Sequence, residues 1–71
     1  MVTIGEKIKE LRQAKGMSQL ELSELIGSNQ TKISGWENNL CEPRVFNCIL
    51  LADIFGVSLD ELCCRDFKGG K

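Results

Sequence analysis

The chain has 71 residues, of which 42% are hydrophobic, so it can form one small domain with one core but no large enclosed pocket. Nine basic residues against ten acidic ones give a net charge of −1. Few lysine and arginine side chains are therefore available to bind phosphates, so we expect any affinity for nucleic acid to depend only weakly on salt concentration. The longest apolar run, residues 48–52, is too short to span a bilayer. No secretory signal opens the chain, and we expect a cytoplasmic protein without a membrane partner.

Cysteine and histidine usage argues against a disulfide framework, a metal site and catalysis. The four cysteines all lie in the C-terminal half, two of them adjacent, and the chain has no histidine. Zinc ligands normally come as spaced pairs, often with histidine, so we expect reduced thiols, no metal and no cofactor. The chain also lacks tyrosine, a nucleophile–base pair and a phosphate-cradling glycine loop, so it is not expected to be an enzyme and has no candidate catalytic residue.

The N-terminal half contains two sequence patterns of the same kind, each of which predicts the start of a helix. Thr3 lies three positions before Glu6, which is the pattern of a capping box and predicts the start of a first helix. Ser18 and Glu21 repeat the pattern and predict a second helix, which we expect Gly27 to end. Its predicted buried face consists of Leu22, Leu25 and Ile26.

A third helix is predicted directly after the second, from a cap at Ser28 or Asn29 to about Asn38. A small residue in the second helix and a glycine at the turn allow two short helices to meet at a steep angle. Such a corner leaves one face of the third helix available to a DNA major groove. Ile33 and Trp36 lie at helical spacing, so we expect Trp36 in the core rather than stacked on a base.

The C-terminal half predicts two further helices and no strand. Pro43 is expected in the first turn of a fourth helix. Ser58 and Glu61 form a third candidate capping box, which opens a short fifth helix. We place the domain at residues 1–66 and expect residues 67–71 to be a flexible tail.

The fourth predicted helix carries more apolar residues than one buried face requires. One stripe consists of Val45, Cys48, Ala52 and Phe55. A second stripe either packs under the fifth helix and the tail or forms a symmetric contact between two subunits, and we favour the second interpretation. The residues assigned to this dimer interface are Phe46, Leu50, Ile54, Leu59, Cys63 and Phe67.

Two segments combine these features: LRQAKGMSQLELSELIGSNQTKISGWENN at residues 11–39 and LLADIFGVSLDEL at residues 50–62, with Pro43 between them. Together they resemble the Cro/C1-type (XRE-like) helix-turn-helix family of phage and bacterial repressors, over roughly residues 4–63. The resemblance implies an all-α, compact five-helix lambda-repressor-like DNA-binding domain, with the helix-turn-helix at the second and third helices. It implies a sequence-specific transcriptional regulator, with repression favoured, that binds a near-palindromic operator in double-stranded DNA as a homodimer.

The resemblance also implies a DNA-contacting face, for which the alternative is an ordinary solvated helix surface. Gln30 and Thr31 match the early outward positions of the recognition helix, where glutamine pairs with adenine and a threonine methyl group meets a thymine methyl group. Gly35 stands where many relatives carry a longer base-reading side chain, and it is expected to allow close approach to DNA. The full predicted set is Gln19, Asn29, Gln30, Thr31, Lys32, Ser34, Gly35, Asn38 and Arg44.

Two further points follow from the resemblance. Arg12 and Glu37 match positions that form an ion pair between the first and third helices in several family members, where the pair orients the recognition helix. The loop after the third helix is usually basic in the family, whereas here it reads Leu40–Cys41–Glu42. This departure removes phosphate contacts.

Two other functions stay open. A protein-interaction module of the same fold, such as an antitoxin or a regulator-binding partner, is favoured by the pI of about 5.3 and by the loop that lacks basic residues. Its partner would be another protein, with only weak DNA binding. A thiol sensor built on Cys63 and Cys64 is a weaker alternative. A salt-titrated binding assay on promoter fragments separates the DNA-binding regulator from the interaction module.

Overall fold

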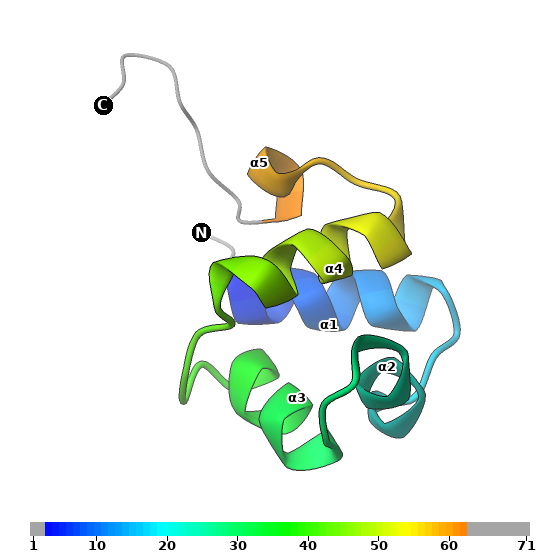
Figure 1. The fold of residues 1–71 in the computed structure, drawn as a ribbon, viewed down its shortest axis with the longest axis vertical. Helices are drawn as coiled ribbons and strands as arrows, with labels where there is room; N and C mark the ends of the chain where they lie inside the picture. The colour runs from blue at the N-terminus through cyan, green and yellow to red at the C-terminus, as the bar shows by residue number, and fades with distance from the viewer. Residues whose placement is uncertain (1–2, 63–71) are drawn as a thin grey trace.

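The computed structural model describes residues 3–62. In that range the chain is all-helical, as predicted, with five helices: α1 (Ile4–Ala14), α2 (Gln19–Ile26), α3 (Gln30–Glu37), α4 (Val45–Phe55) and α5 (Leu59–Leu62). In Figure 1, α1 and α4 lie across the middle of the molecule, with α2 and α3 below them and α5 above. Of these five helices, none has both the length and the apolar character needed to cross a membrane.

Both predicted capping boxes of the N-terminal half are present. At the start of α1, the Glu6 N–H donates to Thr3 Oγ1 and the Thr3 N–H donates to Glu6 Oε1, both at 3.1 Å. At the start of α2, the Glu21 N–H donates to Ser18 Oγ at 3.0 Å and the Ser18 N–H donates to Glu21 Oε1 at 2.9 Å. These reciprocal bonds satisfy backbone donors that a helix start leaves unpaired, so the helices begin where the sequence predicts.

Helix α3 is closed at both ends by asparagine. Asn29 caps its start, because its Oδ1 accepts a bond from the Lys32 N–H at 2.9 Å. Asn39 follows its end with φ of 62°, in the left-handed region, which asparagine tolerates better than most residues. The reversal brings the Leu40 N–H to the Gly35 carbonyl oxygen at 2.9 Å. The chain after α3 is therefore folded back against the helix.

All five helices contribute side chains to the core, and Trp36 in it is 3% exposed. This confirms Trp36 as a core residue. Close approach of α1 to α3 depends on Gly5, because a Cβ there would overlap the backbone carbonyl oxygen of Trp36. The buried hydrophobic residues are Ile8, Leu22, Ile26, Ile33, Trp36, Cys48, Leu51, Ala52, Phe55 and Leu62.

Three expectations for the helices are wrong. Leu25 is 60% exposed, because the buried face of α2 consists of Leu22, Ser23 and Ile26. Val45 is 74% exposed, because it is the first residue of α4 and the buried stripe begins one turn later, at Cys48. Pro43 precedes α4 instead of opening its first turn, since the N-cap of the helix is the next residue.

Candidate nucleic-acid interface

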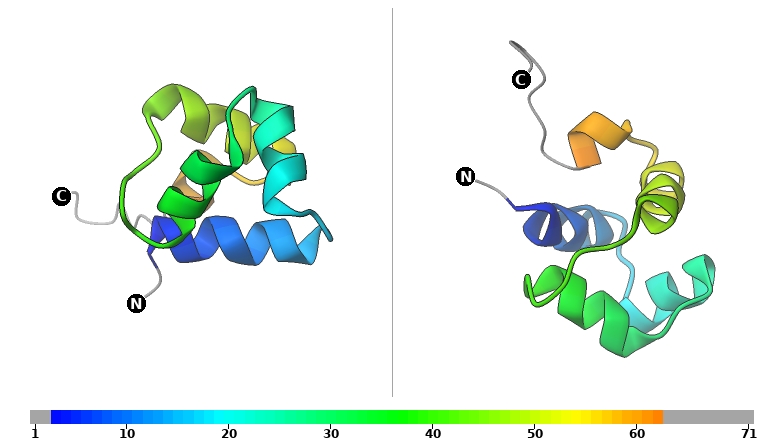
Figure 2. Two further views of the ribbon diagram at one scale, coloured as in Figure 1. Left: turned by 90° about the horizontal axis from the view of Figure 1, so that it is seen from below. Right: turned by 60° about the vertical axis from the view of Figure 1, so that its left-hand side comes forward.

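Helix α3 separates a buried face from an exposed one. Ile33 and Trp36 point into the core, whereas Gln30, Thr31 and Lys32 are exposed. The right-hand view of Figure 2 places α2 and α3 at one end of the molecule and α5 at the opposite end. The outward side of α3 is therefore presented at an end of the domain and not covered by another described helix.

A buried polar junction holds α3 against α1. The Arg12 guanidinium donates to both carboxylate oxygens of Glu37, from Nε at 2.7 Å and from Nη2 at 3.1 Å, and its Nη1 donates to the Met17 carbonyl oxygen at 2.7 Å. Arg12 is 9% exposed and Glu37 is 5% exposed. Burial removes water from both charged groups. The two bonds between the guanidinium and the carboxylate, together with the bond to the Met17 carbonyl, replace hydrogen bonds to that water. The ion pair that the family resemblance implied is thus present.

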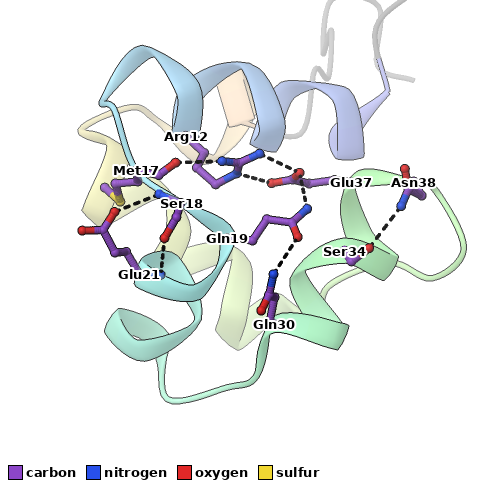
Figure 3. Close-up of polar contacts among 9 residues, drawn as sticks. All are labelled: Arg12, Met17, Ser18, Gln19, Glu21, Gln30, Ser34, Glu37 and Asn38. Carbon is purple, nitrogen blue, oxygen red and sulfur yellow. Dashed lines mark hydrogen bonds and ion pairs between the residues drawn. The ribbon is translucent and has the colours of Figure 1, made fainter.

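The junction continues outward through two glutamines, as Figure 3 shows. Gln19 Nε2 donates to Glu37 Oε1 at 3.0 Å, and Gln30 Nε2 donates to Gln19 Oε1 at 3.5 Å. A carboxylate only accepts, so Gln19 must turn its NH₂ group to Glu37 and its oxygen to Gln30. We call the set Arg12, Glu37, Gln19 and Gln30 the relay. It links a buried ion pair to the first residue of α3.

A hollow of about 690 Å³ runs along the outward side of α3. Its walls come from the start of α2, from α3 and from the residues that lead into α4. Of the nine predicted DNA-contacting residues, seven line it: Gln19, Gln30, Thr31, Lys32, Ser34, Gly35 and Arg44. The other two, Asn29 and Asn38, are the capping residues at the two ends of α3.

The far wall of the hollow is the part that the sequence analysis missed. It is formed by Leu40, Cys41 and Glu42, together with Asn47. The available signal was the left-handed turn at Asn39, which folds the loop back along α3. Among the described residues that line the hollow, the cations are Lys32 and Arg44, and the acidic side chain is Glu42.

Gly35 lies against the loop that follows α3. It is buried, and the Cys41 Sγ lies 3.0 Å from the position that a Cβ at residue 35 would take. The close neighbour of Gly35 is therefore the loop thiol. Beyond it, Asn38 Nδ2 donates to Ser34 Oγ at 3.2 Å, so these two predicted DNA-contacting residues also bond to each other along the helix.

The residues assigned to a dimer interface fall into two groups. Phe46 and Leu59 are exposed, at 70% and 41%. Leu50 and Ile54 are partly buried and pack against the core of their own chain, so the second apolar stripe of α4 is only partly exposed. Cys63 and Phe67 lie outside the described residues.

Comparison with known proteins agrees with this geometry. The family model described as Helix-turn-helix matches residues 8–62. The HTH-type transcriptional regulator ImmR of Bacillus subtilis (strain 168) is 28% identical over 65 residues, which cover 92% of this chain and 51% of ImmR. The chain therefore spans about half the length of this curated relative.

Solved structures with the same fold include DNA complexes. The P22 c2 repressor protein in complex with synthetic operator 9T matches with a TM-score of 0.86 and 29% identity, over 93% of this chain and 100% of that one. SinR in complex with DNA matches with a TM-score of 0.78 and 33% identity, over 84% of this chain and 97% of that one. The complex of SinR with SinI matches with a TM-score of 0.81 and 28% identity, over 97% of this chain and 68% of that one. The chain belongs to the Cro/C1-type helix-turn-helix family of DNA-binding transcriptional regulators.

Proposed function

We propose that this protein is a sequence-specific repressor that binds a near-palindromic operator as a homodimer, with α3 in the major groove. The observation that carries the proposal is the relay. It connects a base-reading amide, Gln30, through Gln19 to the buried ion pair that holds α3 against α1. An ordinary solvated helix face has no need of such a connection.

The relay supports a specific mode of base reading. The bond to Gln19 uses one amide hydrogen of Gln30, so a second N–H and the carbonyl oxygen can face the groove. That pair matches adenine, whose N7 accepts and whose N6 donates in the major groove. Thr31 follows directly and offers a methyl group to a thymine methyl group.

The remaining predicted residues contact the DNA backbone. Lys32, on α3, and Arg44, just before α4, both line the hollow, where each can neutralise a phosphate. Gln19 is the first residue of α2, and Asn29 is the cap of α3, so both lie at helix starts whose N–H groups attract phosphate. The side chains of Ser34 and Asn38 complete the row along α3.

A dimer follows from the need to read two half-sites. A two-fold axis would place two copies of α3 about 34 Å apart on one side of the duplex. The contact proposed for it includes the exposed side chains Phe46 and Leu59, to which we add Ile49. Ile49 is 48% exposed and shares a shallow hollow with Leu59 between α4 and α5.

Selection of bound duplexes from a random pool tests this function. We expect an enriched inverted repeat with half-site centres about 10 base pairs apart, bound by two subunits in analytical ultracentrifugation. Gln30→Ala should relax the preference at one base pair of each half-site, by about 5- to 100-fold. Gln13→Ala, at an exposed glutamine of α1, is the matched control and should leave the selected sequence unchanged. A pool with no enriched sequence contradicts the proposal.

A second candidate, a protein-interaction module, is supported by the charge of the hollow. Its described cations, Lys32 and Arg44, are accompanied by Glu42, and the SinR–SinI complex is an assembly of a similar fold with another protein. Titration of promoter-fragment binding against salt decides between the two functions. A regulator shows a specific shift that persists at moderate salt, whereas an interaction module shows none even at low salt.

A further inference from the structure

Gly35 and Cys41 form a feature of the hollow that the proposed DNA contacts leave unused. The N–H groups of Leu40 and Cys41 donate to the Gly35 carbonyl oxygen, at 2.9 and 3.4 Å, and hold the loop over this part of α3. The Cys41 Sγ lies 3.0 Å from where a Cβ of residue 35 would be. Cys41 is exposed nevertheless, and it lines the same hollow as Gln30. The thiol thus lies beside the place that a side chain at position 35 would occupy.

We propose that Cys41 is a specificity-determining residue that reads the C5-methyl group of a pyrimidine in the operator. The inference rests on the proposed function, because it requires the hollow to face the DNA major groove. It adds to that function the chemical class of one base contact and assigns this contact to the loop, because the helix has no side chain at position 35.

The chemistry of the wall favours a methyl group over a hydrogen-bonding edge. A thiol is a small, polarizable apolar group with only a weak donor. Its neighbour Leu40 is 81% exposed and lines the hollow with it, as does Thr31 on α3. In the major groove the apolar feature of the base edges is the thymine C5-methyl group, whereas the other edges present donors and acceptors. A Cys41–Leu40 wall matches the methyl group.

The pairing of Gly35 with Cys41 makes the two positions dependent on each other. Any side chain at residue 35 begins 3.0 Å from the thiol, so Cys41 would have to shift by a few tenths of an ångström along the wall of the hollow. Gly35→Ala should therefore weaken the same base preference that Cys41→Ser weakens. The double variant should be no worse than either single variant.

Uracil scanning of the selected operator tests the proposal with the full chain. Each thymine is replaced in turn by uracil, which lacks only the methyl group, and affinity is measured by fluorescence anisotropy. Wild-type protein should lose about fourfold at the position that Cys41 contacts in each half-site, the factor for one buried methyl group. Cys41→Ser should bind thymine and uracil equally at that position. Cys41→Ala, which keeps an apolar but shorter side chain, should retain part of the preference.

A control separates this contact from the threonine contact and from folding effects. Thr31→Ser should abolish uracil sensitivity at a different position and leave the Cys41-dependent position unchanged. Equal thermal unfolding midpoints of wild type and Cys41→Ser exclude a structural cause. Sequence-specific binding with identical uracil profiles for wild type and Cys41→Ser overturns this inference alone. Absence of any sequence-specific binding overturns it together with the proposed function.

Discussion

The two sides of α3 differ in how firmly their geometry is determined. On the inner side, Glu37 is 5% exposed and accepts three hydrogen bonds, from Arg12 and Gln19. On the outer side, Gln30 is exposed and its bond to Gln19 is 3.5 Å long. The inner side has one low-energy arrangement, because burial penalises every other one. The outer side has room to adjust to a base.

In the proposed function, this difference gives orientation and specificity to separate parts of the helix. The buried junction of Arg12 and Glu37 sets the angle of α3 relative to α1. The exposed row and the loop across the hollow carry the groups that would discriminate between bases. Changes on the inner side should therefore act on folding and on all DNA sequences alike, whereas changes on the outer side should act on individual base pairs.

The largest effect is expected from removing one partner of the buried Arg12–Glu37 ion pair. Glu37→Ala leaves the Arg12 charge buried without its carboxylate, so we expect the free energy of unfolding in urea to fall by about 3–5 kcal/mol. DNA affinity should fall as well, although Glu37 lies on the inner side of the helix.

A double variant separates orientation from stability. Arg12→Met combined with Glu37→Leu removes both charges and should recover most of the lost free energy of unfolding. It also removes the acceptor of Gln19, so DNA binding should stay weak while the fold recovers. A double variant that binds the operator as tightly as wild type would show that the junction does not orient α3.

Gly5→Ala tests the close approach of α1 to α3 on the same inner side. Alanine normally favours a helix over glycine by about 1 kcal/mol. Here its Cβ would overlap the Trp36 carbonyl oxygen, and we expect a net loss of about 2 kcal/mol in the free energy of unfolding. Glu10→Ala, at an exposed site of α1, should change it by less than about 0.5 kcal/mol. A more stable Gly5→Ala variant would mean that the helices are not held this close.

Sequence reasoning predicted the inner side better than the outer one. Capping boxes are local, so Thr3 and Ser18 could be assigned to helix starts from their neighbours alone, and spacing placed Trp36 in the core. Contact between Gly5 and the Trp36 carbonyl depends on a crossing between helices far apart in the chain, which periodicity does not encode. Leu25 was misassigned for a related reason, because the choice of inward residue on α2 is made by packing.

The residues that line the hollow were likewise only partly predictable from the sequence. The residues on α3 and α2 that line the hollow were predicted as DNA contacts because the family resemblance fixes their register. The wall formed by Leu40 and Cys41 depends on how the backbone turns at Asn39 and on where the loop then runs, and the path of the loop is set by packing. The neighbour of Gly35 could be found only with coordinates.

Gln19→Ala tests the link between the two sides. It removes one of the three bonds to Glu37 and the partner of Gln30, while the Arg12 bonds to Glu37 remain. We expect operator affinity to fall about tenfold, whereas the free energy of unfolding falls by about 1 kcal/mol or less. Gln13→Ala is again the matched control. Equal losses of affinity for specific and random DNA would show that Gln19 acts only on a phosphate and does not orient Gln30.

Glu42→Lys should give the smallest change in DNA binding, and it tests whether the hollow on the outer side of α3 faces DNA. Glu42 is exposed on the rim of the hollow, where a lysine can reach a phosphate if the hollow faces DNA. The slope of log affinity against log salt should then steepen by about 0.9 for one added phosphate contact, with the preferred sequence unchanged. Glu10→Lys makes the same charge change on α1 and should leave the slope nearly unaltered. Equal slopes for the two variants would mean that the charge acts through the whole molecule and that the hollow does not contact the DNA backbone.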